Sequence, residues 1–236
     1  MKRTLACFAL ALAPLPAFAN DLNIGNLTSQ AEFRALSEDL GAALSYKPLT
    51  PAAPLGVTGF DVGLAMTVTQ VENSPAWAKA GAGNRSNVVV PTLRAHKGLP
   101  FDIDVGVMYA RVPGTDIQLW GGELRYALMA GSAALPAVGL RASYTRLAGV
   151  NQLDFNTKGL DLSVSKGFAF ITPYAGVGAV WVTSTPNGVA GLSKESFTQG
   201  KLFAGVNANF GLMNIALEGD RTGDVNTYGM KVGFRF

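Results

Sequence analysis

The sequence has 236 residues, 48% of them hydrophobic and 15% charged, and removing Lys2 and Arg3 from its 19 basic residues leaves 17 against 16 acidic ones. Such an even balance does not favour nucleic acid as a partner. Cys7 is the only cysteine and His96 the only histidine, so we expect no disulfide after residue 19, no metal site and no cofactor.

Residues 1–19 have the pattern of a secretory signal peptide. Lys2 and Arg3 are basic, the stretch from Leu5 to Pro16 is apolar, and Ala17-Phe18-Ala19 is a small-x-small cleavage site. The apolar run is too short, and too rich in proline, to cross a membrane as a helix. The chain is therefore expected to leave the cytoplasm.

Residues 20–56 are predicted to form an N-terminal periplasmic segment with a short helix over residues 30–40. Ser29 followed by Glu32 has the form of a capping box, and Gly41 is a plausible helix end. The apolar residues that share one helical face are Phe33, Leu36 and Leu40. We favour a helix in the periplasm or packed at a rim, and a plug inside the barrel mouth is the alternative.

Residues 57–236 alternate between apolar and polar positions, which is the periodicity of β-strands. In the first such segment the apolar positions are Phe60, Val62, Leu64, Met66 and Val68. About ten segments of this kind can be counted, with eight or twelve as alternatives. Long polar connections are expected over residues 72–85 and 184–198, and a turn is expected at Pro113-Gly114.

The last segment shows the pattern most clearly. Its apolar face consists of Tyr228, Met230, Val232, Phe234 and Phe236. A fully apolar face opposite a mixed one is typical of a strand with lipid on one side and a lumen on the other. With its signal peptide, its alternation and Phe236, the chain resembles the bacterial outer-membrane β-barrel proteins.

The resemblance implies an all-β fold, a transmembrane antiparallel up-and-down barrel over residues 57–236. It also implies an assembly signal at Tyr228, Phe234 and Phe236, read by the barrel-assembly machinery. Outer-membrane lipid and periplasmic chaperones would be further partners, and a small solute is an open alternative. A soluble periplasmic sandwich or lipocalin-like barrel, with its aromatic residues inside, is the competing interpretation.

Connection lengths predict the orientation in the Gram-negative outer membrane. Short connections near Gly98 and Gly211 fit the periplasmic side, and the long ones fit the outside. The C-terminus then lies in the periplasm, and an even strand number places the N-terminal segment there too. Aromatic residues are expected in two interfacial girdles. The external girdle is Tyr109, Trp120, Tyr144, Trp181 and Tyr228, and the periplasmic girdle is Phe60, Phe101, Phe210, Phe234 and Phe236.

Charged residues at inward positions predict a polar lumen network. Its members are Asp104, Glu123, Arg125, Arg141, Glu218 and Lys231. Asp104 is expected to pair with Arg125, and Glu218 with Lys231, because an unmatched charge inside a narrow barrel would be costly. Arg141 is expected beside the strand of Glu123. About ten strands leave an interior only slightly wider than one that side chains fill.

These features favour a small, mostly closed barrel with a structural or surface-binding role through its external loops. A narrow channel or transporter for small or apolar solutes is the alternative. An outer-membrane enzyme is disfavoured, because His96 is expected at the periplasmic interface with no nucleophile in reach. No catalytic residue is therefore predicted.

Overall fold

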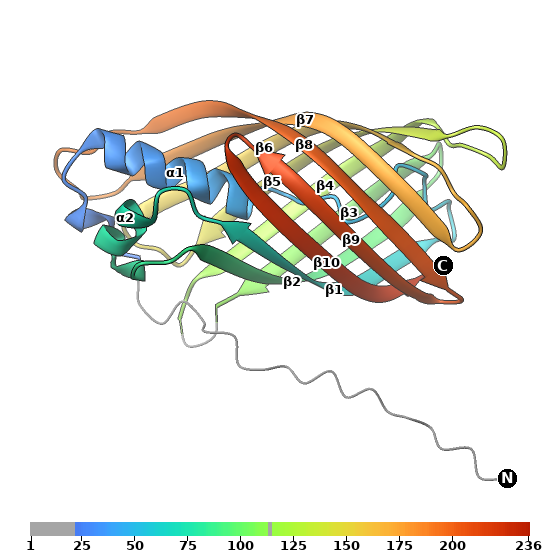
Figure 1. The fold of residues 1–236 in the computed structure, drawn as a ribbon, viewed down its shortest axis with the longest axis horizontal. Helices are drawn as coiled ribbons and strands as arrows, with labels where there is room; N and C mark the ends of the chain where they lie inside the picture. Colours follow the sequence, from blue (N-terminus) through green and yellow to red (C-terminus); the bar gives the residue numbers. More distant parts are fainter. Residues whose placement is uncertain (1–21, 113–114) are drawn as a thin grey trace, which may run out of the picture.

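The computed structural model describes residues 22–112 and 115–236, which form a closed barrel of ten antiparallel strands with a helix at one end (Figure 1). The strands are β1 (Phe60–Gln70), β2 (Asn87–Leu99), β3 (Ile103–Arg111), β4 (Gln118–Met129), β5 (Ala137–Ala148), β6 (Leu153–Ser165), β7 (Ile171–Pro186), β8 (Glu195–Phe210), β9 (Met213–Thr222) and β10 (Val225–Arg235). Each strand pairs with its neighbours in the sequence, and β1 closes the barrel against β10. The predicted barrel and its strand number are confirmed. The predicted signal peptide lies outside the described residues.

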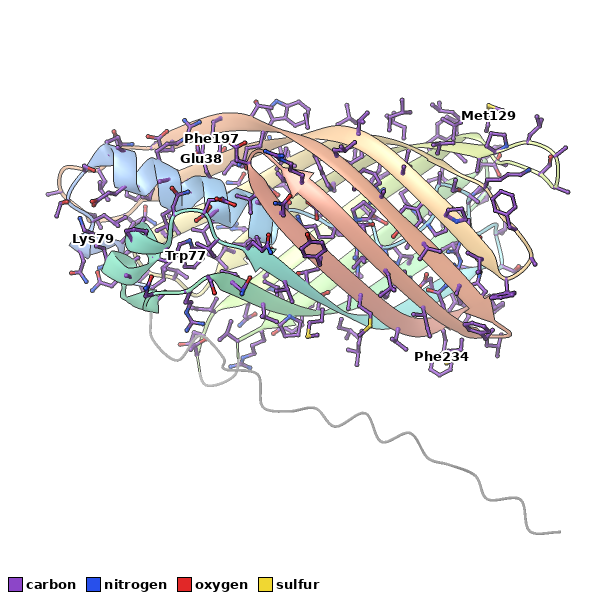
Figure 2. The ribbon with its side chains drawn as sticks, in the orientation of Figure 1. Glu38, Trp77, Lys79, Met129, Phe197 and Phe234 are labelled. Carbon is purple, nitrogen blue, oxygen red and sulfur yellow. The ribbon has the colours of Figure 1, made fainter. Side chains whose placement is uncertain are left out.

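Side chains alternate between the outer surface and the lumen. On β10, Tyr228 is 59% exposed and Phe234 is 66% exposed, whereas Lys231 is fully buried. Figure 2 shows Phe234 on the outside of the barrel. Because large apolar side chains cover the outside and charges are buried inside, the barrel is inverted relative to a soluble protein. The interpretation as a soluble barrel with its aromatic residues inside is wrong.

The two ends of the barrel differ in their connections. At the end opposite the C-terminus, residues 71–86 join β1 to β2 and contain the short helix α2 (Ser74–Trp77) and the π-turn η2 (Ala78–Ala82). Two residues, 211–212, suffice at the other end between β8 and β9. The predicted loop over 184–198 is too long, because β7 and β8 continue as strands that wall the N-terminal helix (Figure 1). The turn predicted at Pro113-Gly114 lies outside the described residues.

The N-terminal helix, α1 (Gln30–Leu44), follows a short 3₁₀ turn, η1 (Ile24–Asn26). The predicted Ser29 cap is confirmed, because Ser29 Oγ accepts the amide of Glu32 at 3.3 Å. The Glu32 carboxylate accepts the amide of Thr28 at 2.9 Å, one residue before the N-cap position that a complete capping box would use. The buried face is Phe33, Leu36 and Leu40, as predicted, and it packs into an apolar core at this end of the barrel. None of the described helices is long and apolar enough to cross a membrane.

The prediction that α1 ends at Gly41 is wrong, because the helix continues to Leu44. Gly41 serves close packing instead. A Cβ atom added there would lie 2.7 Å from Cγ2 of Val182 on β7, closer than real Cβ contacts come. The missing side chain therefore lets α1 lie directly against the barrel wall.

Residues 45–56, the threaded segment, leave α1 and run through the lumen without helix or strand structure. Near the start of the segment Lys47 donates to Asp220 on β9, and further along the amide of Leu55 donates to Asp104 at the start of β3, near the opposite end. The favoured expectation placed the helix at the same end of the barrel as the C-terminus, and this is corrected: α1 plugs the barrel mouth at the other end, which was the alternative (Figure 1). An even number of strands places the start of β1 at the same end of the barrel as the C-terminus. The segment before β1, however, runs back through the lumen and so places α1 at the other end.

Candidate functional site: the closed lumen

The lumen holds a buried network of opposite charges. Arg125 on β4 donates to Asp104 on β3 at 2.8 Å, and these two residues are direct cross-strand partners, as predicted. Glu123 lies between two guanidinium groups, with its carboxylate oxygens 3.5 Å from Nε of Arg125 and 3.6 Å from Nε of Arg141. The predicted proximity of Arg141 to Glu123 is thus confirmed. Attraction between neighbouring opposite charges offsets the cost of removing each of them from water. A buried ion without a partner would bear that cost in full.

The predicted pair of Glu218 with Lys231 is wrong. β9 and β10 join through a two-residue turn in which Gly223 has φ +60°, and Thr222 pairs with Val225. This register places Gly229 opposite Glu218. Lys231 instead binds Asp61 across the β1–β10 closure.

His96 is buried in the lumen, so its predicted place at the membrane interface is wrong. Its Nε2 lies 3.0 Å from a carboxylate oxygen of Glu123 and 3.3 Å from the hydroxyl of Tyr46. Arg94, two residues earlier on β2, also faces inward. The alternation of β2 could have indicated both inward positions, but Pro91 obscures that pattern in the sequence.

The threaded segment receives most of its hydrogen bonds from lumen side chains. Lys201 donates to the carbonyl of Tyr46 at 2.8 Å, and Arg94 donates to the carbonyl of Lys47 at 2.6 Å. The amide of Leu49 donates to Glu218 at 2.7 Å. Further along, Arg125 donates to Thr50, and the amides of Ala52 and Leu55 donate to Ser165 and Asp104. Buried backbone without regular structure needs such partners, so the charged lumen solvates the segment that fills it.

Opposite charges are nearly matched in the described lumen, which the partly buried guanidinium of Arg235 also enters. The buried carboxylates are Asp61, Asp104, Glu123, Asp161, Glu218 and Asp220, and the buried cations are Lys47, Arg94, Arg125, Arg141, Lys201 and Lys231. Lys47 of the threaded segment contributes one of these pairs, with its ammonium 2.9 Å from Asp220. Lys47 and Arg94 were missed by sequence reasoning. Nothing in a sequence shows that a residue preceding the first strand lies inside the barrel.

A buried carboxylate on α1 holds the connection of residues 71–86 over the barrel mouth. Asp39 accepts hydrogen bonds from the amide of Asn73 at 3.0 Å and from Nε1 of Trp77 at 2.9 Å. Trp77 is buried beside α1 (Figure 2). Burial raises the pKa of Asp39, and the hydrogen bonds from Asn73 and Trp77 oppose that rise. The connection thereby serves as a cover for the plug.

Strands β7 and β8 hold the other side of α1. The hydroxyl groups of Ser37 and Ser184 are hydrogen-bonded at 2.9 Å. Arg34 lies 3.2 Å from Glu195 and stacks over the ring of Phe197, 3.8 Å from its centroid. A cation on an aromatic face adds to the apolar packing. α1 is thus fixed to the barrel wall along its length.

The residues predicted as an assembly signal all lie on the outer surface. Tyr228, Phe234 and Phe236 are exposed, and the ring of Phe236 packs edge-on against that of Phe60, with 4.1 Å between ring centroids. Phe60 and Phe236 also exchange two backbone hydrogen bonds, of 2.8 and 3.0 Å. Phe236 therefore has a structural role in closing the barrel, apart from any role in assembly.

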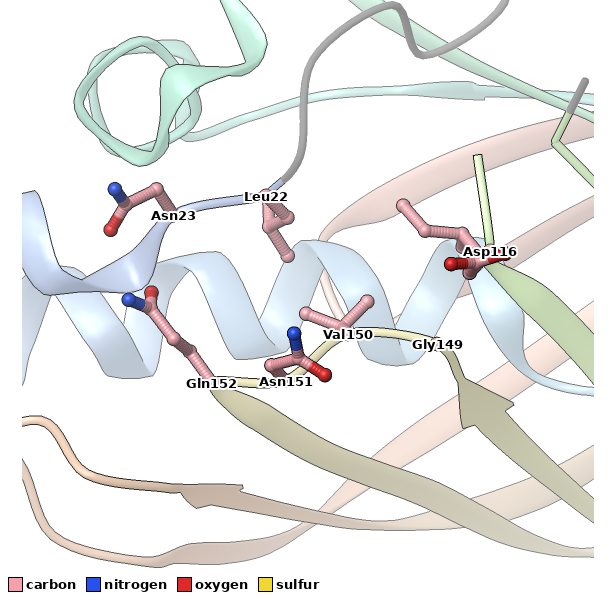
Figure 3. A pocket seen from close by; sticks show the side chains of 8 residues that line it. Leu22, Asn23, Asp116, Gly149, Val150, Asn151 and Gln152 are labelled. Atoms are coloured by element: carbon pink, nitrogen blue, oxygen red, sulfur yellow. The ribbon is translucent and has the colours of Figure 1, made fainter. Parts of the chain in front are cut away.

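A pocket of about 560 Å³ opens at the plugged end (Figure 3). Its walls come from the start of the described chain and the connections after β3 and β5, through Leu22, Asn23, Asp116, Ile117, Gly149, Val150, Asn151 and Gln152. No predicted site residue lines it. Within the described residues, no group of three or more His, Cys, Asp or Glu side chains is arranged to hold a metal ion.

Comparisons with known proteins give structural likenesses. No protein-family model matches the chain, and no curated protein matches it in sequence. The N-terminal β-barrel domain of Pseudomonas aeruginosa OprF is 16% identical, with a TM-score of 0.39, over 77% of this chain and 99% of that one. The outer membrane protease OmpT of Escherichia coli is 12% identical, with a TM-score of 0.39, over 75% and 95% of the two chains. The attachment invasion locus protein Ail of Yersinia pestis, in complex with a heparin analogue, is 16% identical, with a TM-score of 0.34, over 75% and 97%.

The chain is thus similar in structure to bacterial outer-membrane barrels. These likenesses are distant, and the architecture is established by the chain's own strand pairing. The side chains of the described lumen bind the threaded segment. Its carboxylates and guanidinium groups are occupied by one another and by that segment's backbone.

Proposed function

We propose that this protein is an integral outer-membrane β-barrel, closed by its own N-terminal segment, with a structural or surface-binding role at its plugged end. One observation carries the proposal: the outer surface is apolar around the barrel, while the charges are buried inside. Large apolar side chains are exposed on successive strands, among them Leu64, Leu93, Val107, Leu124, Leu162, Val177, Leu202 and Leu217. A surface of this extent suits lipid, since soluble monomers rarely expose large apolar patches.

The lengths of the connections support an orientation for the barrel. The longest described connections, residues 71–86 and 187–194, lie at the plugged end, and those at the C-terminal end include residues 100–102 and 211–212. Outer-membrane barrels keep their short turns in the periplasm. The C-terminus would then be periplasmic and α1 would face the outside. This placement differs from the expected periplasmic N-terminal segment because residues 45–56 cross within the lumen.

Conductance measurements test the closed state. Protein refolded into lipid, shown to be folded by its heat-modifiable migration on gels, should give very small or no conductance in planar bilayers. The physical reason is that the threaded segment and paired charges leave little continuous water. A stable, large, ohmic conductance from the unmodified protein would instead establish a channel.

A gated channel is the second candidate, and the threaded segment is the observation that favours it. Residues 45–56 have no regular structure, and water could replace their side-chain hydrogen bonds if the segment moved. The double variant Ser37→Cys/Ser184→Cys tests this, because the two hydroxyl groups are 2.9 Å apart. Conductance that appears after reduction and disappears after oxidation would support gating by α1.

The remaining expectations stay predictions. Outer-membrane lipid, the barrel-assembly machinery and periplasmic chaperones are the proposed partners. No enzymatic activity is proposed, and hydrolysis of lipid or peptide substrates by the refolded protein would contradict that view. His96 is bound to Glu123 and Tyr46 rather than to a nucleophile.

A further inference from the structure

One outer face of the barrel, toward its plugged end, combines aromatic and basic side chains. On β4 to β7 these are Trp120, Tyr144, Arg146, Lys158 and Trp181, here called the rim cluster. All five are exposed. On the same strands, the outward positions further from the plugged end are apolar, such as Leu140 on β5 and Leu160 and Leu162 on β6. The rim cluster therefore marks the upper edge of the apolar surface.

Strand pairing places the members of the rim cluster side by side. Arg146 is directly opposite Trp120, and Lys158 is directly opposite both Tyr144 and Trp181. Since Arg146 pairs with Asn156, Arg146 and Lys158 are diagonal neighbours across β5 and β6. Diagonal neighbours are separated by roughly 7–8 Å, within the reach of two long side chains toward one group.

The two cations of the rim cluster have no partner among residues 22–112 and 115–236. Neither the guanidinium of Arg146 nor the ammonium of Lys158 makes a hydrogen bond or ion pair with another described residue. Asp154, which lies on the same face of β6, accepts a hydrogen bond from Asn187 instead. Two other outward cations are occupied: Arg221 binds Asp224 at 3.1 Å, and Lys97 donates to the carbonyl of Val57 at 2.7 Å.

We propose that the rim cluster binds the phosphate-bearing headgroup of an anionic lipid. The proposal rests on the membrane location proposed above and adds a defined lipid site to it. In a bilayer, the edge of the apolar surface is the depth of the headgroups, where Trp and Tyr are enriched and basic residues attract anionic lipid. The guanidinium of Arg146 offers two parallel donors to phosphate oxygens, and the ammonium of Lys158 adds a second charge. The aromatic rings of the rim cluster would pack against the glycerol and the upper acyl chains of the bound lipid.

Tryptophan fluorescence gives a local readout of this site. Of the three tryptophans, Trp120 and Trp181 belong to the rim cluster, and Trp77 is buried beside α1. The refolded protein is placed in phosphatidylcholine vesicles that contain either brominated phosphatidate or brominated phosphatidylcholine at equal mole fraction. Bromine quenches a nearby indole, so stronger quenching by phosphatidate measures local preference for the anionic lipid. We expect such a preference at low ionic strength.

Two double variants with equal loss of charge separate the site from general attraction. Arg146→Gln/Lys158→Gln should reduce the local preference roughly 25-fold, since each basic residue at a membrane surface accounts for roughly a fivefold effect. Lys97→Gln/Arg221→Gln should leave it unchanged. The exchange Arg146→Lys/Lys158→Arg should keep most of it.

The outcomes distinguish this inference from the proposed function. Equal quenching by the two brominated lipids, or an unchanged preference in Arg146→Gln/Lys158→Gln, would overturn the lipid site but leave the barrel in the membrane. Loss of the preference on adding inorganic phosphate would overturn the lipid as ligand in favour of free phosphate. No quenching by either lipid would overturn the membrane location itself.

Discussion

The backbone amide of Leu49 donates a 2.7 Å hydrogen bond to the carboxylate of Glu218 on β9. The same carboxylate accepts the hydroxyl of Tyr174 at 2.9 Å, so Glu218 links β7, β9 and the threaded segment at one buried point. Leu49 has φ +51°, a left-handed conformation that is unfavourable for a branched side chain. The hydrogen bond helps to hold it there.

Replacing Glu218 by Ala should destabilise the plugged barrel. Both donors would be left unsatisfied in a buried site, at about 1–3 kcal/mol each. Glu218→Gln keeps an acceptor oxygen and should cost less. Urea unfolding of the refolded proteins measures the difference, and equal midpoints for the two variants would show that Leu49 does not depend on this acceptor.

Replacing Gly41 by Leu should detach α1 from the barrel wall while leaving the strands intact. The added side chain would overlap Val182 on β7, as the 2.7 Å distance from an added Cβ shows. The matched control is Ala31→Leu, because Ala31 is exposed on the same helix.

Limited proteolysis of folded protein separates these two helix variants. Gly41→Leu should release the N-terminal segment to protease, and Ala31→Leu should not. Equal protection of both would mean that α1 has room to move without leaving the wall.

The barrel could be predicted from the sequence because lipid and lumen impose opposite demands on alternate residues. Phe234 and Lys231 show this directly, as one is exposed to the outside and the other buried. Pairing between distant strands was predictable only where the turn was placed correctly. Asp104 pairs with Arg125 as predicted, but the turn at Gly223 shifts the pairing of β9 with β10 by two residues, so that Gly229 instead of Lys231 lies opposite Glu218.

The plug was only the alternative in the sequence analysis, for a different reason. The helix itself was predicted from Ser29 and Glu32, but local patterns do not say on which side of the barrel a helix lies. Residues 45–56 have no periodicity, and their position depends on side chains from many strands, such as Lys201 and Arg94. Such long-range hydrogen bonds leave no local pattern in the sequence.

Arginine at the middle of the outer surface should be costly, and arginine near its upper edge should be tolerated. Leu217 is half-exposed in the middle of β9, whereas Thr198 is exposed on β8 directly opposite Trp181. On a lipid face, arginine costs about 2–4 kcal/mol at the midplane and about 0–1 kcal/mol near the interface. Unfolding of Leu217→Arg and Thr198→Arg in lipid vesicles compares them. Equal stability would contradict the membrane depth assigned here.

Acid should loosen the start of α1. The ammonium of Lys79 and the amide of Thr28 lower the pKa of Glu32 from 4.5 to about 2. Because the folded-state pKa is depressed, the contribution of Glu32 to stability is complete above about pH 4.5 and is lost as the pH falls toward 2. Hydrogen exchange at the first turn of α1 should therefore speed up over this range, and Glu32→Gln should remove that part of the pH dependence. A wild-type profile that is flat between these values would contradict the role of the contact.

Replacing Phe236 by Asp should lower the yield of folded protein in the outer membrane and leave unfolded chain in the periplasm. Phe236 completes the outward apolar face of β10 and packs against Phe60, at 4.1 Å between ring centroids. Loss of yield could therefore reflect recognition by the assembly machinery or a weaker closure of β1 against β10. Refolding in pure lipid vesicles separates the two, because no machinery is present there. We expect Phe236→Asp to refold in vesicles with only a small loss of stability, while its yield in the outer membrane of cells falls severely. Phe60→Asp should lower the yield in cells less than Phe236→Asp does. Full outer-membrane yield of heat-modifiable Phe236→Asp would remove Phe236 from the assembly signal.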